Sequence, residues 1–155
     1  MPLFAQGVYA LVSWWAATGG MRSADVEGET EEGRERGRVG RRGELLAYWF
    51  LRRQGYTVIR RHYQAASKQG DIDLIAWDGD VLVFVEVKTR TGEKGNLPEE
   101  SITFDQQHSL RGLARNYLKR RGWPDVRYRF DVVAVDAQPG KRPEVRMYQG
   151  AFGPA

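Results

Sequence analysis

Two apolar segments on either side of an Asp-Gly pair constrain this chain more than any other feature. Residues 70–77 read Gly-Asp-Ile-Asp-Leu-Ile-Ala-Trp, and residues 80–88 read Asp-Val-Leu-Val-Phe-Val-Glu-Val-Lys. β-Branched and large apolar residues favour strands, and Asp-Gly between two such segments is the strongest short-range signal for a tight type I′ hairpin. The sequence therefore predicts an antiparallel hairpin whose two turn residues are Asp78 and Gly79.

This turn fixes a register for the two strands. It sets Asp71 opposite Glu86 and Asp73 opposite Phe84. Because side chains alternate between the two faces of a strand, we expect both aspartates to share one face with Phe84, Glu86 and Lys88. The opposite face of the second strand is wholly apolar and must be buried, since it consists of Val81, Val83, Val85 and Val87.

Carboxylates gathered on a half-buried strand repel one another, and each loses hydration energy unless a cation or a hydrogen-bond donor compensates. In the predicted register Asp73 lies diagonal to Glu86, at roughly 7 to 8 Å between backbones, a gap that one or two divalent cations can bridge. The alternative is that Glu86 and Lys88 are exposed residues paired with each other or with Asp71. Against it, residues 81–87 are so apolar that they resemble a central strand, where an acid needs a reason.

Composition narrows the available chemistry. With 155 residues the chain fits one domain. Cysteine is absent, which excludes thiol nucleophiles, disulfides and thiolate zinc sites and is compatible with the reducing cytoplasm, where we expect the protein to act. His62 and His108 show no spacing typical of a metal pair or a catalytic triad, so we expect both to be surface or packing residues. Hydrolysis would have to rest on carboxylates, lysine and a bound metal.

The net charge of +4 is modest, but the basic residues are concentrated in the first half of the chain and in a later helical segment. Arginine-rich surfaces near an acidic metal site suit a polyanion, and we expect nucleic acid as the partner, DNA rather than RNA. The alternative is a solvated surface in an arginine-rich proteome. The candidate nucleic-acid contacts are Arg41, Arg42, Arg90, Arg111, Arg115 and Lys119.

The N-terminal residues lack the pattern of a domain. Residues 1–20 are too short and too interrupted for a membrane span and lack the positive start of a signal peptide, so we expect a mis-assigned start or a disordered extension and no membrane role. Residues 22–40 are rich in Glu, Gly and Arg, which predicts a flexible leader. We therefore expect the domain to cover residues 41–152 and residues 1–40 to be dispensable for stability.

The remaining chain alternates helical and strand patterns. Thr103 and Gln106 fit a capping box that opens the second helix, and Gly122 ends it. The loop after Lys88 contains glycine and proline, which permit movement. The predicted order is αβββαββ, an α/β or α+β domain with a mixed sheet flanked by helices. Besides the hairpin, we predict a helix over 44–54 and strands over 56–63, 126–135 and 145–148.

A helix acid, an Asp before an apolar triplet and Glu-x-Lys on the next strand together resemble the restriction-endonuclease-like superfamily and its PD-(D/E)xK signature. The likeness extends to an ordered series of motifs that resembles the small bacterial UPF0102 (YraN-like) family, which is related to Holliday junction resolvases. It covers roughly residues 40 to 152. The motifs are Gly43-Glu44, Gly70-Asp71-Ile72-Asp73-Leu74-Ile75, Phe84-Val85-Glu86-Val87-Lys88-Thr89-Arg90 and Arg129-Phe130-Asp131-Val132-Val133.

This resemblance implies a restriction-endonuclease-like core and a metal-dependent endonuclease site at Glu44, Asp73, Glu86 and Lys88. The three acids would be ligands of Mg²⁺ or Mn²⁺, with Lys88 orienting or deprotonating the attacking water. Family members often carry a Lys early in the second helix, where this chain has Gln106. The alternative function is a non-catalytic nucleic-acid-binding module or an accessory protein. A homodimer is a further expectation, because resolvases act on two strands.

Overall fold

The computed structural model describes residues 30–66, 70–92 and 102–154. Within these ranges, two helices and one five-stranded sheet follow in the predicted order, αβββαββ, so the predicted fold class is confirmed. The predicted extension over residues 1–20 and most of the predicted mobile loop lie outside the described residues. The elements are α2 (Glu31–Arg53), β1 (Thr57–Tyr63), β2 (Ile72–Asp78), β3 (Val81–Arg90), α3 (Phe104–Arg121), β4 (Tyr128–Asp136) and β5 (Glu144–Phe152).

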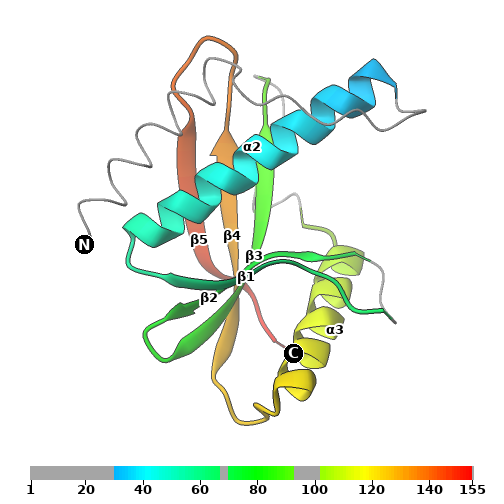
Figure 1. Cartoon of the computed structure of the whole chain (residues 1–155), viewed down its shortest axis with the longest axis vertical. Helices are drawn as coiled ribbons and strands as arrows, with labels where there is room; N and C mark the ends of the chain where they lie inside the picture. Colours follow the sequence, from blue (N-terminus) through cyan, green and yellow to red (C-terminus); the bar gives the residue numbers. More distant parts are fainter. Residues whose placement is uncertain (1–29, 67–69, 93–101, 155) are drawn as a thin grey trace.

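The sheet is mixed and has β3 at its centre. Its strand order is β1-β2-β3-β4-β5, with β3 and β4 parallel and the other neighbours antiparallel. Figure 1 shows α2 crossing the sheet over β3, β4 and β5. Helix α3 lies away from α2, beside the other end of the strands. The two helices belong to separate apolar clusters: α3 packs on Phe84 and Phe130, and α2 packs on Val85 and Val133. The helices therefore cover opposite faces of the sheet.

The hairpin forms, but its turn differs from the prediction. Asp78 pairs with Val81, so the turn residues are Gly79 and Asp80, and Leu74 pairs with Val85. A type I′ turn at Asp78-Gly79 would need positive φ at both residues, whereas here only Gly79 has it, with φ of 59°. Each strand shifts by one residue, which preserves the parity of the register, so Asp73 comes opposite the part of β3 that carries Glu86.

Helix α2 starts much earlier than predicted, at Glu31 instead of Glu44. The predicted flexible leader is therefore wrong for residues 31–40. Thr30 caps the helix by accepting a hydrogen bond from the Gly33 N–H at 3.2 Å. Glu and Arg have good helix propensity, so a segment without core residues can extend a helix that is already anchored by packing further along. Two ion pairs along this extension support it, Glu31 with Arg34 and Glu35 with Arg38.

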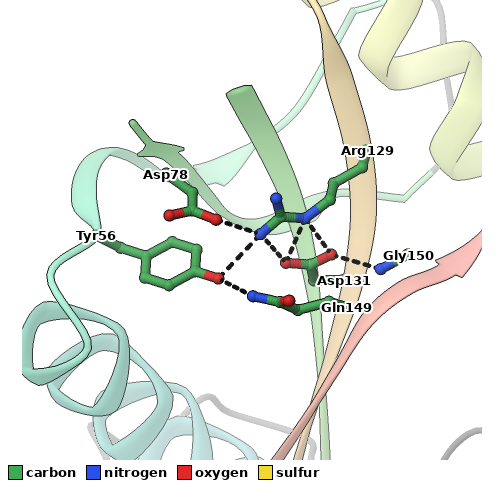
Figure 2. Close-up of polar contacts among 6 residues, drawn as sticks. All are labelled: Tyr56, Asp78, Arg129, Asp131, Gln149 and Gly150. Atoms are coloured by element: carbon green, nitrogen blue, oxygen red, sulfur yellow. Dashed lines mark hydrogen bonds and ion pairs between the residues drawn. The ribbon is translucent and has the colours of Figure 1, made fainter. Parts of the chain in front are cut away.

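A polar network stabilises the sheet at the end remote from the helix extension (Figure 2). Asp131 is fully buried and accepts hydrogen bonds from Arg129 Nε at 2.9 Å and from the Gly150 N–H at 2.9 Å. Arg129 Nη2 also donates to Asp78 at 2.8 Å and to the Tyr56 hydroxyl at 2.9 Å. These bonds raise the pKa of Arg129, and the hydrogen bonds that its guanidinium donates to Asp131 are the largest cause. The network joins the start of β1, the end of β2, β4 and β5.

Helix α2 approaches β3 so closely that only glycine fits at one position. A Cβ at Gly43 would overlap Oγ1 of Thr89 and lie 2.9 Å from its Cβ. Gly43 is buried, and Glu44 follows it directly. The close approach therefore helps to determine where the Glu44 carboxylate lies.

We predict that Gly43→Ala lowers the free energy of unfolding by about 2 kcal/mol, because the added methyl group forces α2 away from β3. Gly40→Ala is the matched control. It lies on the same helix with nothing within 4 Å of the new Cβ, and should raise stability by about 0.5 kcal/mol through helix propensity. Urea denaturation of both variants measures the difference, and equal stabilities would contradict the close-approach argument.

Candidate active site

The predicted acids gather where β2 separates from β3. The last backbone pair of this ladder is Leu74 with Val85. Beyond it, the Val87 N–H donates to Oδ2 of Asp73 at 2.6 Å. Ile72 packs in the cluster under α3, whereas Leu74 packs in the cluster under α2, so the regular alternation of β2 breaks at Asp73. The Asp73 carboxylate thus takes the place of a backbone partner and lies along the edge of β3.

The electrostatics of this cluster are unfavourable for negative charge. Burial and the neighbouring charge of Glu86 raise the pKa of Asp73 to about 8, although the hydrogen bond from Val87 opposes the shift. Burial also raises the pKa of Glu86 and of Glu44, and Asp71 raises each of them further. Four carboxyl groups, one each from α2, β2 and β3 and one from Asp71 just before β2, therefore lie close enough to influence one another.

Lys88 supplies positive charge at this cluster. Its Nζ lies 3.1 Å from Oε1 of Glu86, and the side chains of Lys88 and Glu86 are 25% and 17% exposed. The alternative interpretation expected these two residues to be an exposed pair. They are paired, but both are largely covered. The ion pair lowers the pKa of Glu86 without cancelling the effect of its burial.

His62 belongs to the site, although its spacing in the sequence indicated a surface or packing residue. Its Nε2 lies 3.1 Å from Oε2 of Glu44 and its Nδ1 lies 3.8 Å from Oδ2 of Asp71. Its backbone has φ of 49°, and it is the one described residue other than glycine with positive φ. Such strained backbone conformations concentrate at functional sites. No spacing signal could have revealed this residue, because it meets the acids only through this local conformation.

We predict that His62→Val lowers the free energy of unfolding by about 2 kcal/mol, although valine normally favours strands. A β-branched residue cannot adopt positive φ without strain, whereas asparagine and glycine tolerate it. His62→Asn and His62→Gly should therefore stay within about 1 kcal/mol of the parent in the same denaturation assay. A valine variant as stable as the asparagine variant would show that the backbone conformation is not required.

The six predicted nucleic-acid contacts fall on different parts of the fold. Arg41 and Arg42 lie on α2, while Arg115 and Lys119 are exposed on α3, which covers the opposite face. Arg90 and Arg111 have internal partners. Arg90 Nη2 forms an ion pair with Asp136 at 2.8 Å, and Arg111 Nε donates to the carbonyl of Gly153 at 2.8 Å. The basic residues therefore do not form one stripe, and their contact with nucleic acid stays a prediction.

A cavity of about 720 Å³ opens beside the acids, between the first half of α2 and the end of β3. Glu44 and Val87 line it, which makes it continuous with the acid cluster. Its other walls mix charged, polar and apolar side chains, namely Glu32, Glu35, Arg36, Val39, Gly40, Thr89, Arg90 and Thr91. The cavity offers room for a substrate next to Glu44.

The carboxylate oxygens of Glu44, Asp73 and Glu86 are the donors that Mg²⁺ and Mn²⁺ prefer, and their raised pKa values reflect negative charge that a cation would stabilise. Within residues 30–66, 70–92 and 102–154, no three acidic or histidine side chains are yet arranged as a complete ligand set. Asp73 and Glu86 instead bind Val87 and Lys88. The donor chemistry fits a divalent cation, and side-chain rotation would have to complete the coordination.

Neither helix of the described part of the chain is long and apolar enough to cross a membrane.

Comparison with known proteins identifies the family. The profile described as "Uncharacterised protein family UPF0102" matches residues 43–135. The chain is 48% identical over 115 residues to a UPF0102 protein of Symbiobacterium thermophilum, covering 74% of this chain and 96% of the relative. It is 42% identical over 113 residues to one of Solibacter usitatus and 41% identical over 114 residues to one of Rhodococcus jostii. These alignments cover 73% and 74% of this chain, and 84% and 95% of the relatives. This chain therefore belongs to the UPF0102 family.

Proposed function

We propose that this protein is a metal-dependent endonuclease that hydrolyses phosphodiester bonds in DNA in the bacterial cytoplasm. The observation that carries the proposal is the cluster of covered carboxylates with Lys88 at the point where β2 leaves β3. Burial and like charge raise the pKa of Asp73 to about 8, which is costly for a purely structural group. Perturbed carboxyl groups beside a cavity are candidates for a functional site.

In this proposal the acidic residues bind the metal ion, and Lys88 acts on the attacking water. Asp73 and Glu86, together with Glu44, would hold Mg²⁺ or Mn²⁺, and the Val87 carbonyl is a further oxygen donor. Such an ion would supply positive charge that polarises the phosphate and lowers the pKa of a nearby water. Lys88 would orient that water and offset the charge of the phosphate, after exchanging its ion pair with Glu86 for these contacts. His62 would hold the Glu44 carboxylate in place.

The non-catalytic alternative also has an observation in its favour. Lys88 already neutralises Glu86, and the described residues present no finished ligand set. A module that binds nucleic acid without cutting it would need no more than this. Metal binding and turnover therefore have to be measured separately.

The test is a cleavage assay on four-way junctions, flaps, duplexes, single strands and RNA, with Mg²⁺, Mn²⁺ or EDTA. We expect divalent-dependent cleavage of at least one structured DNA and none in EDTA. Isothermal titration with Mn²⁺ in the absence of substrate provides the second measurement, and light scattering tests the proposed homodimer. Binding of DNA without cleavage of any substrate would favour the non-catalytic module, and absence of both would overturn the nucleic-acid function.

A further inference from the structure

A second cavity, between β1 and α3, has walls of a different chemistry. Its volume is about 280 Å³. Six residues line it, namely Arg60, Tyr63, Gln64, Tyr117, Arg120 and Arg121. Three of the six are arginines and none is acidic. Among the described residues, these three arginines form no ion pair with an Asp or Glu. The cavity thus concentrates positive charge that no described carboxylate neutralises.

One of these arginines is held in a fixed orientation. The Arg121 guanidinium lies 5.3 Å from the ring centre of Tyr117 and 5.5 Å from that of Trp123, and its Nε lies 3.2 Å from the Tyr117 hydroxyl. Tyr117 is itself supported by Tyr63, whose ring meets it edge-on at 5.0 Å and whose hydroxyl donates to Asn116 at 2.6 Å. Among the described residues, Nε is the Arg121 nitrogen with a hydrogen-bond acceptor, so the two terminal nitrogens remain to donate to the oxygens of a phosphate.

Strand β1 connects this cavity with the acid cluster, and it is irregular in two places, at His62 and between Val58 and Arg60. Residues three apart in a regular strand lie on opposite faces, yet both Arg60 and Tyr63 line the cavity. The left-handed backbone of His62, which lies between them, breaks the alternation. The same conformation directs the His62 imidazole to Glu44. A register shift between Val58 and Arg60 adds a β-bulge, a feature that often redirects side chains beside functional sites.

Consecutive residues of β1 therefore belong to two sites, with His62 at the acids and Tyr63 in the arginine cavity. β1 is an edge strand of the sheet, so no described strand lies beyond it. A nucleic-acid strand carries a phosphate on every nucleotide, and one held at the acids can pass this edge and bring another phosphate to the arginines. Arg120 and Arg121 interact favourably with the dipole at the C-terminal end of α3, which explains their presence there. The helix dipole does not explain why Arg60, from β1, lines the same cavity.

We propose that Arg60, Arg120 and Arg121 form a phosphate-binding subsite for the DNA strand whose scissile bond lies at the acid cluster. The inference rests on the proposed nuclease function and specifies the path of its substrate across the edge of β1. The ligand is a phosphodiester of the DNA backbone, read without regard to base sequence.

The experiment measures binding without cleavage, so it does not depend on turnover. Fluorescence anisotropy follows the full chain binding a labelled single-stranded DNA in EDTA across a range of NaCl concentrations. The test variant is Arg60→Gln/Arg120→Gln, because both side chains are exposed and their loss should not disturb folding. Lys141→Gln/Arg142→Gln removes the same charge from the exposed turn before β5 and is the matched control.

We expect the test variant to bind at least about tenfold more weakly than the control variant at low salt. The slope of log K against log[NaCl] should also fall by about 1.4, or about 0.7 for each lost phosphate contact. Arg60→Lys/Arg120→Lys should restore most of the affinity, since lysine keeps the charge. If the parent binds DNA but the test and control variants behave alike, the subsite is wrong and the nuclease proposal stands. If the parent does not bind DNA even at low salt, both proposals fail.

Discussion

Asp73→Asn should abolish metal-dependent cleavage and at the same time stabilise the metal-free protein. An amide is a poor metal ligand compared with a carboxylate, so we expect cleavage to fall at least about a thousandfold, or about 4 kcal/mol of transition-state stabilisation. Binding of DNA should change little, because the arginines that we propose as phosphate contacts remain. The combination of lost activity and gained stability is the signature of a group kept for function.

The stability gain depends on pH in a direction set by the raised pKa of Asp73. A carboxyl group whose pKa rises from 3.8 to about 8 on folding binds its proton more tightly in the folded state. The contribution of Asp73 to the free energy of unfolding is therefore most favourable at low pH, and it falls as the pH rises between these two values. Asparagine carries no such penalty and still accepts the Val87 hydrogen bond. We expect Asp73→Asn to exceed the parent by on the order of 2 kcal/mol at pH 8 and to approach it near pH 4.

Urea denaturation in EDTA at several pH values, together with cleavage assays, measures both effects. Asp80→Asn is the matched control, because it makes the same chemical change at an exposed turn of the same hairpin. It should alter neither cleavage nor the pH dependence of stability. An Asp73→Asn variant that cleaves as well as the parent would eliminate the proposed metal site.

Asp131→Ala should lower the free energy of unfolding by about 3 kcal/mol or more, the largest stability effect we expect. The change leaves the Gly150 N–H without its acceptor and deprives Arg129 of its buried partner (Figure 2). Removing one member of a buried charged pair is costly because the remaining charge keeps its desolvation penalty. Since the network joins β2, β4 and β5, the loss should appear as cooperative destabilisation of the sheet.

Two milder variants provide a comparison for the loss of unfolding free energy in Asp131→Ala. Asp131→Asn keeps an oxygen for Gly150 but removes the charge, so its effect should be intermediate. Asp78→Asn weakens an ion pair at a side chain that is 41% exposed and should cost less than about 1 kcal/mol. Equal effects for all three variants would show that the network does not depend on the buried charge of Asp131.

Local patterns were sufficient to predict the element order and several boundaries. Apolar alternation located β2 and β3. The capping box of Thr103 and Gln106 begins α3, and Gly122, with φ of 67°, ends it as predicted. These features succeed because they rest on interactions between neighbours in the chain. The capping role also engages the Gln106 side chain, which accepts a hydrogen bond from the Thr103 N–H.

Extension of α2 and the position of the turn could not be predicted by the same means. Residues 31–40 contain almost no core-forming side chains, and their helix depends on the packing of the segment that follows. Asp78-Gly79 and Gly79-Asp80 are both acceptable turns locally, and the choice follows from how the two strands fit the sheet and place Asp78 beside Arg129.

The sequence by itself determined that β2 and β3 form one hairpin, which brings Asp73 near Glu86, because two apolar segments flank a short turn. The direction of the Asp73 side chain was decided by the tertiary structure, since the alternation of β2 breaks at this residue. Only the tertiary structure decided that His62 joins the acids and that Arg60 meets Arg121 across β1 and α3. The first depends on a left-handed backbone angle at His62, which histidine adopts more often than most residues but which most histidines do not adopt. The second joins elements far apart in the chain, which meet because Tyr63 of β1 and Tyr117 of α3 pack in the same apolar cluster.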